Sequence, residues 1–144
     1  MKIDFFETGY GMDQRAVGPG VYMVELVKNG KEGGICLYIG ESVWIASRCG
    51  VHLYSLSEDP NYFGLEREDI ENEDFTLKFS VVKSIDEKKS ILGCGVYKEA
   101  ELNAIRNNNP LTQLSTSDRQ IKDEEKKTRV QNELLKRGFK SDSK

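Results

Sequence analysis

The sequence predicts an α/β protein of the α+β type: a small three-stranded antiparallel sheet flanked by helices, with a C-terminal helical extension. Three observations support this prediction. Two short apolar runs, 21–27 and 35–39, enclose a turn with an Asn-Gly pair, which is a strong hairpin signal. A third alternating run covers 75–85, and helical spacing of apolar residues recurs between and after these runs. A chain of 144 residues is long enough for one domain with a modest core.

The first two runs are expected to pair as a β-hairpin. Val21 to Val27 alternates between two faces, residues 28–34 form the turn, and Ile35 to Ile39 is the returning strand. Tyr22 stands near the start of the first strand and Tyr38 near the end of the second. In an antiparallel pair these two positions lie close together in space.

A helix is predicted directly after the hairpin, with Ser42 as its N-cap. Arg48 and His52 are four residues apart and therefore share one helical face. The acidic segment 57–75 follows, read as a loop with a short helix near 65–70.

The rest of the chain adds one strand and two helices. The strand covers 75–85, and helices are expected over 96–108 and 117–136, the second ended by Gly138. Residues 2–6 are a candidate short edge strand. The expected organisation is a main domain over 1–113 and a helical extension over 114–144.

Composition restricts the partners and the compartment. No apolar run approaches the length of a membrane span, and the N-terminus lacks a signal pattern, so we expect a cytoplasmic protein without membrane contact. Three separated cysteines fit reduced structural thiols. The net charge of −3 is unevenly spread: 58–75 holds eight acids against one base, and 114–144 holds nine bases against six acids. Either both are solvated faces, or the basic end faces DNA.

Several residues resemble motifs of one nuclease family. Gly20-Val21-Tyr22 is followed by Tyr38-Ile39-Gly40; Arg48 comes eight residues after Gly40, and His52 four after Arg48. Glu101 precedes Ile105 and Pro110 at a matching spacing. Over roughly 18–113 the chain resembles the GIY-YIG nuclease family, which implies a small α/β nuclease fold.

The resemblance also implies roles for the residues. It makes Tyr22 the general base or the group that orients the attacking water, and Glu101 the ligand of a catalytic metal. The chain departs from the family pattern at Gln113, where the family often has Asn, and in the added segments 57–75 and 114–144. These additions leave the choice of substrate open.

The chemistry of these residue types fits cleavage of a phosphodiester. Arg48 offers a charged planar fork to phosphate oxygens, and Tyr38 can hydrogen-bond the phosphate or the water. His52, the lone histidine, is an alternative base or a phosphate ligand. Glu101 is a hard oxygen ligand suited to Mg²⁺ or Mn²⁺. Glu99 competes for that role, but lies about 200° away around a helix.

The sequence therefore predicts a metal-dependent endonuclease acting on DNA. Expected phosphate contacts are Arg48 together with basic residues of the last helix: Lys126, Lys127, Arg129, Lys136 and Arg137. The alternative is a catalytically inactive binding module for nucleic acid or a protein partner, with the acidic 58–75 segment acting as a nucleic-acid mimic. A structural domain with chance matches is a third interpretation, in which the tyrosines pack across a hairpin and Arg48 is merely solvated. A protein partner or a homodimer is compatible with each.

Overall fold

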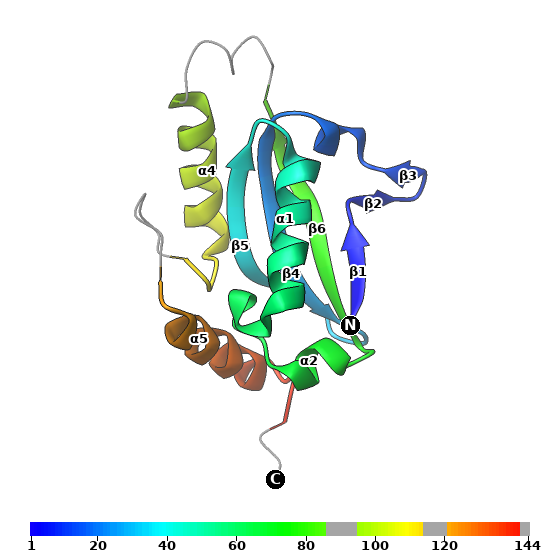
Figure 1. Ribbon diagram of the computed structural model, residues 1–144, viewed down its shortest axis with the longest axis vertical. Coiled ribbons are helices and arrows are strands. Elements are labelled where there is room, and N and C mark those ends of the chain that lie inside the picture. The colour runs from blue at the N-terminus through cyan, green and yellow to red at the C-terminus, as the bar shows by residue number, and fades with distance from the viewer. Residues whose placement is uncertain (86–94, 114–120, 142–144) are drawn as a thin grey trace.

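The computed structural model describes residues 1–85, 95–113 and 121–141. Its main sheet has four strands in the order β1-β6-β4-β5, formed by Lys2–Phe5, Phe75–Ser84, Gly20–Lys28 and Ile35–Ser42 (Figure 1). The prediction of a mixed α and β protein is confirmed, but the prediction of a three-stranded antiparallel sheet is wrong. The fourth strand, β1, pairs in parallel with β6, so the sheet is mixed. A second, two-stranded sheet joins β2 (Glu7–Thr8) to β3 (Gly11–Met12).

The predicted hairpin is present and longer than expected. Strand β4 pairs antiparallel with β5 on one side and with β6 on the other. The outer edge of β5 is covered by residues 111–113, because the backbone N–H groups of Leu111 and Thr112 donate to the carbonyls of Cys36 and Leu37. Therefore β5 is not an open edge, although it ends the sheet.

The helix after the hairpin, α1, spans Ile45–Glu58 and lies over one face of the sheet. The prediction that Ser42 caps it is wrong. Ser42 ends β5, and its Oγ accepts a hydrogen bond from the backbone N–H of Trp44, the residue at the N-cap position. The serine still satisfies a backbone donor near the helix start, but as part of the turn that precedes the helix.

A short helical segment, η1 at Gln14–Val17, precedes β4. Two more follow α1: η2 covers Pro60–Phe63, and α2 covers Arg67–Glu71. Two longer helices complete the fold, α4 at Gly95–Asn108 and α5 at Asp123–Lys136. The predicted start of the last helix at 117 lies outside the described residues. Among the described helices, none combines the length and apolar composition that a membrane span requires.

Two apolar clusters cover the two faces of the sheet. On one face, Tyr22, Val24 and Leu26 of β4 pack with α1 and α5, and α5 contributes Val130 and Leu134. On the other face, α4 packs against β4 and β5 through residues that form the second cluster: Val21, Ile39, Ile85, Ala104 and Ile105. The C-terminal helix thus shares the core of the main sheet.

Cys49 is buried in the first cluster, Cys36 is half-buried, and Cys94 lies outside the described residues.

Candidate functional site

Tyr22 and Tyr38 are brought together by an irregularity in the hairpin. Tyr22 pairs with Gly40 and Val24 with Tyr38, but Glu25 already pairs with Cys36, so Leu37 is an extra residue. A bulge of this kind reverses the faces of the residues beyond it. Tyr38 therefore lies on the α1 face beside Tyr22, with ring centroids 6.2 Å apart.

Gly40 makes room for this pair of tyrosines. A methyl group at residue 40 would collide with the Tyr22 hydroxyl, and would lie 2.6 Å from Tyr22 Cζ and 2.8 Å from Tyr38 Cε1. Such distances are well inside van der Waals contact. The glycine is thus required by close packing of two aromatic side chains on its strand and its neighbour.

His52 joins the cluster from α1. Its Nε2 lies 2.6 Å from the Tyr22 hydroxyl, and its Nδ1 lies 2.7 Å from the Tyr62 hydroxyl. The imidazole is 1% exposed, and its ring centroid is 4.9 Å from that of Tyr38 and 5.8 Å from that of Phe63. One histidine is therefore hydrogen-bonded between two tyrosines inside an aromatic shell.

Arg48 lies one turn before His52 and is exposed. Its guanidinium is close enough to the Tyr22 hydroxyl to oppose the rise in the pKa of that group, and it interacts electrostatically with Tyr38 and Tyr62. The structure thus brings four predicted site residues, Tyr22, Tyr38, Arg48 and His52, into one cluster on the α1 face.

Burial keeps Tyr22 and His52 neutral. Burial, together with the positive charges of Arg48 and Lys126, lowers the pKa of His52 to about 4. Burial also raises the pKa of Tyr22 well above its ordinary value, an effect that Arg48 opposes but does not cancel. At neutral pH both Tyr22 and His52 are therefore uncharged.

The neutral imidazole carries one N–H, so it donates to one tyrosine and accepts from the other. Arg48 is a cation that can only donate, so its guanidinium is attracted to a lone pair of the Tyr22 hydroxyl and leaves the O–H free to donate. This favours donation from Tyr22 to Nε2 of His52, with Nδ1–H donating to Tyr62. The proton of Tyr22 then points at a ring nitrogen that can accept it.

Tyr62 was not among the predicted site residues. It lies in η2, within the acidic segment that reads as an addition to the domain. Lys126 of α5 sits 5.2 Å from the centroid of its ring and donates to its carbonyl at 3.3 Å. Pro60 and Gly64 mark a tight turn here, but no local pattern indicates that the turn folds back onto the histidine.

Glu101 comes from a different layer. It lies on α4, which packs against the sheet face opposite to α1, and it is 3% exposed. Glu99 of the same helix is exposed, so the two carboxylates do differ in orientation as their spacing indicates. Glu101, the predicted metal ligand, is thus the buried one of the two acids, and it lies on the far side of the sheet from the helix that carries His52.

Metal ligands are sparse in the part of the chain that the structure describes. No three His, Cys, Asp or Glu side chains there are grouped so that they could hold an ion. A site built on Glu101 would depend on water and substrate oxygens for its remaining ligands, which is the usual way that Mg²⁺ binds.

Gln113 stands where the family pattern often has Asn. Its side-chain Oε1 accepts the backbone N–H of Ile39 at 2.6 Å, and its Nε2 donates to the Ile39 carbonyl at 3.0 Å. The amide therefore acts as a two-point clamp on the outer edge of β5, one residue from Tyr38. Its contacts are structural.

The basic residues predicted to contact DNA are largely engaged within the protein. Lys127 pairs with Glu66 at 3.6 Å, and Arg129 donates to the Gln113 carbonyl at 3.3 Å. Arg137 packs over the Phe139 ring. Lys136 is exposed. A role in DNA contact stays a prediction for all of them.

Comparison with models of protein families, with curated proteins and with solved structures gives no match to this chain. The function therefore has to be argued from the geometry of the site.

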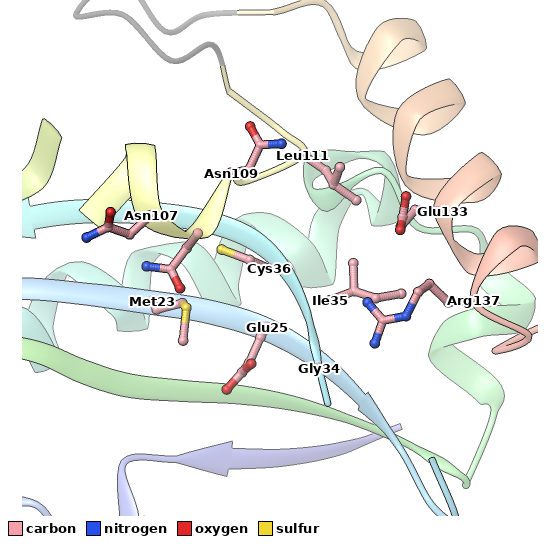
Figure 2. Close-up of a pocket in the computed structure, with 11 residues that line it drawn as sticks. Met23, Glu25, Gly34, Ile35, Cys36, Asn107, Asn109, Leu111, Glu133 and Arg137 are labelled. Atoms are coloured by element: carbon pink, nitrogen blue, oxygen red, sulfur yellow. The ribbon is translucent and has the colours of Figure 1, made fainter. Parts of the chain in front are cut away.

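A separate polar pocket lies on the other face of the sheet, at the opposite end of the hairpin (Figure 2). Its volume is about 350 Å³, and Glu25, Cys36, Glu133 and Arg137 are among the residues that line it. None of the clustered tyrosines, the histidine or Arg48 lines this pocket, so it is distinct from the candidate site.

Proposed function

We propose that this chain is a metal-dependent endonuclease that hydrolyses phosphodiester bonds in DNA. The observation that carries the proposal is the 2.6 Å contact between the Tyr22 hydroxyl and His52 Nε2, beside the guanidinium of Arg48. A hydroxyl group, a neutral imidazole and a fixed cation are the groups needed to move a proton and to bind a phosphate.

His52 supplies the proton acceptor in this mechanism. Tyr22 alone cannot act as a base at neutral pH, because burial raises the pKa of its hydroxyl and keeps it protonated. Since the pKa of His52 is lowered to about 4, its protonation requires the negative charge of a bound phosphate nearby. If Tyr22 takes a proton from the attacking water, its own proton passes to Nε2 of His52. The developing imidazolium donates through Nδ1 to Tyr62, which holds the ring in place.

Arg48 and Tyr38 are the groups that substrate meets first. Tyr22 and His52 are buried, whereas Arg48 is exposed and Tyr38 is half-buried. A phosphate bound by the guanidinium would draw it away from the Tyr22 hydroxyl, and charge-assisted hydrogen bonds to phosphate compensate for that loss. Substrate binding and exposure of the reacting hydroxyl are thus coupled through one side chain.

Glu101 would hold Mg²⁺ or Mn²⁺ with water and phosphate oxygens as the other ligands. The donor type fits these hard cations, and one protein carboxylate is enough for such a site. When bound, the ion would supply charge neutralisation and a coordinated water of lowered pKa. This part of the proposal requires Glu101 to reach the phosphate from the sheet face opposite to α1.

A plasmid-nicking assay with Mg²⁺ or Mn²⁺ tests the proposal. We expect the native chain to nick DNA, and Tyr22→Phe and His52→Gln to reduce the rate by roughly 100-fold or more, the usual cost of losing a general base. Arg48→Ala should reduce it by loss of phosphate binding. Glu101→Gln should abolish the nicking that Mg²⁺ or Mn²⁺ supports, because it removes the protein ligand of the ion.

Two matched controls separate these effects from general damage. Tyr54→Phe removes a hydroxyl from an exposed tyrosine of α1, and Glu99→Gln neutralises the exposed acid two residues from Glu101. Both should retain full activity. The absence of cleavage by the native protein over a range of divalent metals and DNA forms would exclude the enzyme.

A catalytically inactive binding module is the second candidate. It is favoured by the complete burial of Tyr22 and His52 and by the position of Glu101 on the helix of the opposite face. The acidic segment is only partly available as a nucleic-acid mimic, because Glu66 and Asp69 pair with Lys140. Fluorescence anisotropy with labelled DNA, run beside the nicking assay, distinguishes binding without cleavage from catalysis.

A further inference from the structure

Strand β1 is the open edge of the main sheet. The opposite edge, β5, is covered by Leu111 to Gln113, but among the described elements no strand or segment pairs with the outer side of β1 (Figure 1). An uncovered edge presents unpaired backbone groups that can pair with another chain. The chain leaves the sheet after Phe5, because Phe6 has a φ of 58°.

The direction of the backbone groups along β1 can be worked out. The N–H of Phe6 donates to the carbonyl of Phe79 in β6, so even-numbered residues of this strand direct their backbone groups inward. Direction alternates along a strand. The N–H and C=O groups of Ile3 and Phe5 therefore face outward, where the described residues offer them no partner.

The side chains on this edge suit a second copy of the same strand. Lys2 and Asp4 lie on one face of β1, and Ile3, which is 41% exposed, lies on the other. An antiparallel pair related by a two-fold axis can be centred on any one of these residues. Centring on Lys2 or on Asp4 places like charges directly opposite each other, which is unfavourable.

Centring on Ile3 pairs the outward backbone groups and also places opposite charges across the interface. The two Ile3 residues would exchange N–H···O=C bonds, since both groups face outward. Lys2 of each copy would then stand opposite Asp4 of the other. Asp4 is already fixed at the edge, because its Oδ1 accepts the N–H of Glu7 at 3.0 Å.

We propose that the chain forms a two-fold homodimer by antiparallel pairing of β1 strands, centred on Ile3, with Lys2 opposite Asp4. The sheet continues across the interface. The apolar groove beside β1, lined by residues that include Ile3, Leu53 and Ile70, then adjoins the same groove of the second copy. This proposal is independent of the proposed nuclease function.

The oligomeric state of the full chain, measured by sedimentation over a wide concentration range, tests the proposal. The native chain is expected to be in a concentration-dependent monomer–dimer equilibrium. Lys2→Asp and Asp4→Lys should each weaken the dimer by about tenfold, because two symmetric pairs become like-charged. The double variant, with the charges exchanged, should restore the native dissociation constant within about threefold.

Ile3→Pro tests the backbone pairing separately. It removes an N–H group that β6 does not use, so it should abolish the dimer while the circular dichroism spectrum of the monomer is retained. Lys31→Asp, an equal change of charge on the exposed β4–β5 turn, is the control and should leave the dimer intact. A native chain that stays monomeric at all concentrations, a dimer insensitive to Ile3→Pro, or a double charge variant that fails to restore dimerisation would each overturn the proposal.

Discussion

The stability of this protein should fall steeply between pH 6.5 and pH 5 because of one residue. His52 is the lone histidine of the chain, so no other imidazole titrates in this interval. Its pKa is about 4 in the folded protein, where burial and the charges of Arg48 and Lys126 oppose protonation. In the unfolded chain its pKa returns to about 6.5.

The sign and size of the effect follow from these two values. Below pH 6.5 the unfolded chain binds a proton that the folded protein does not, so acid favours unfolding. Between pH 7.5 and pH 5 the free energy of unfolding should fall by roughly 2 kcal/mol, and the loss approaches about 3 kcal/mol as the pH reaches the folded pKa. Above about pH 7.5 the imidazole is neutral in both states, so the free energy of unfolding no longer changes with pH through this residue.

Urea denaturation at a series of pH values measures this slope. His52→Gln keeps a polar group of similar length and has no proton to bind in this range, so its stability should be nearly flat from pH 7.5 to pH 5.5. The ring resonances of the single histidine report its protonation directly. A native-state pKa near 6.5 by NMR, or an equal slope in the variant, would refute the reasoning.

Three further predictions concern stability. Gly40→Ala should cost about 1–3 kcal/mol by overpacking against the tyrosines, whereas Gly50→Ala, in open space on α1, should be neutral or stabilise by up to about 1 kcal/mol; thermal unfolding measures both. Gln113→Ala should cost roughly 2 kcal/mol, because it unpairs two buried backbone groups of β5, and hydrogen exchange at that edge should rise. Lys140→Met should cost about 1–3 kcal/mol by leaving a buried carboxylate without its cation, while Lys136→Met, at an exposed position, should have no effect in urea denaturation.

The hairpin and its helix could be predicted because their signals are local. The alternation of apolar and polar residues and the Asn-Gly turn locate β4 and β5. The four-residue spacing of Arg48 and His52 places them on adjacent turns of one helix. The bulge at Leu37 has no such signal. Strict alternation would put Leu37 and Ile39 on one face, yet the structure separates them, and only this change of face brings Tyr38 beside Tyr22.

Long-range pairings account for what the sequence did not reveal. The parallel partner of β1 lies over seventy residues away, and a parallel pairing leaves no turn to indicate it. Tyr62 meets His52 only because η2 folds back under α5. The position of Glu101 follows from which face of the sheet α4 covers, and amphipathic spacing alone does not choose between the two faces.

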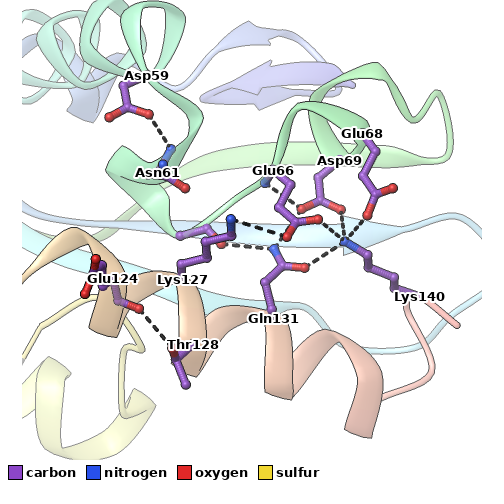
Figure 3. A network of polar contacts seen from close by, with 11 residues as sticks. Asp59, Asn61, Glu66, Glu68, Asp69, Glu124, Lys127, Thr128, Gln131 and Lys140 are labelled. Carbon is purple, nitrogen blue, oxygen red and sulfur yellow. Dashed lines mark hydrogen bonds and ion pairs between the residues drawn. The ribbon is translucent and has the colours of Figure 1, made fainter. Parts of the chain in front are cut away.

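Helix α2 contacts residues near both ends of the described chain, and Figure 3 shows the contacts of Lys140 with Glu66 and Asp69. The ammonium group of Met1 donates to the carbonyl of Ile70, and Lys140 binds Glu66 and Asp69 at the other side of the same short helix. A helix of five residues has little stability of its own. During synthesis Asp69 therefore lacks its cation until residue 140 has emerged. The rate at which this region orders should depend on closing two loops, of 69 residues to Met1 and of 71 residues to Lys140, because contacts of high sequence separation form slowly.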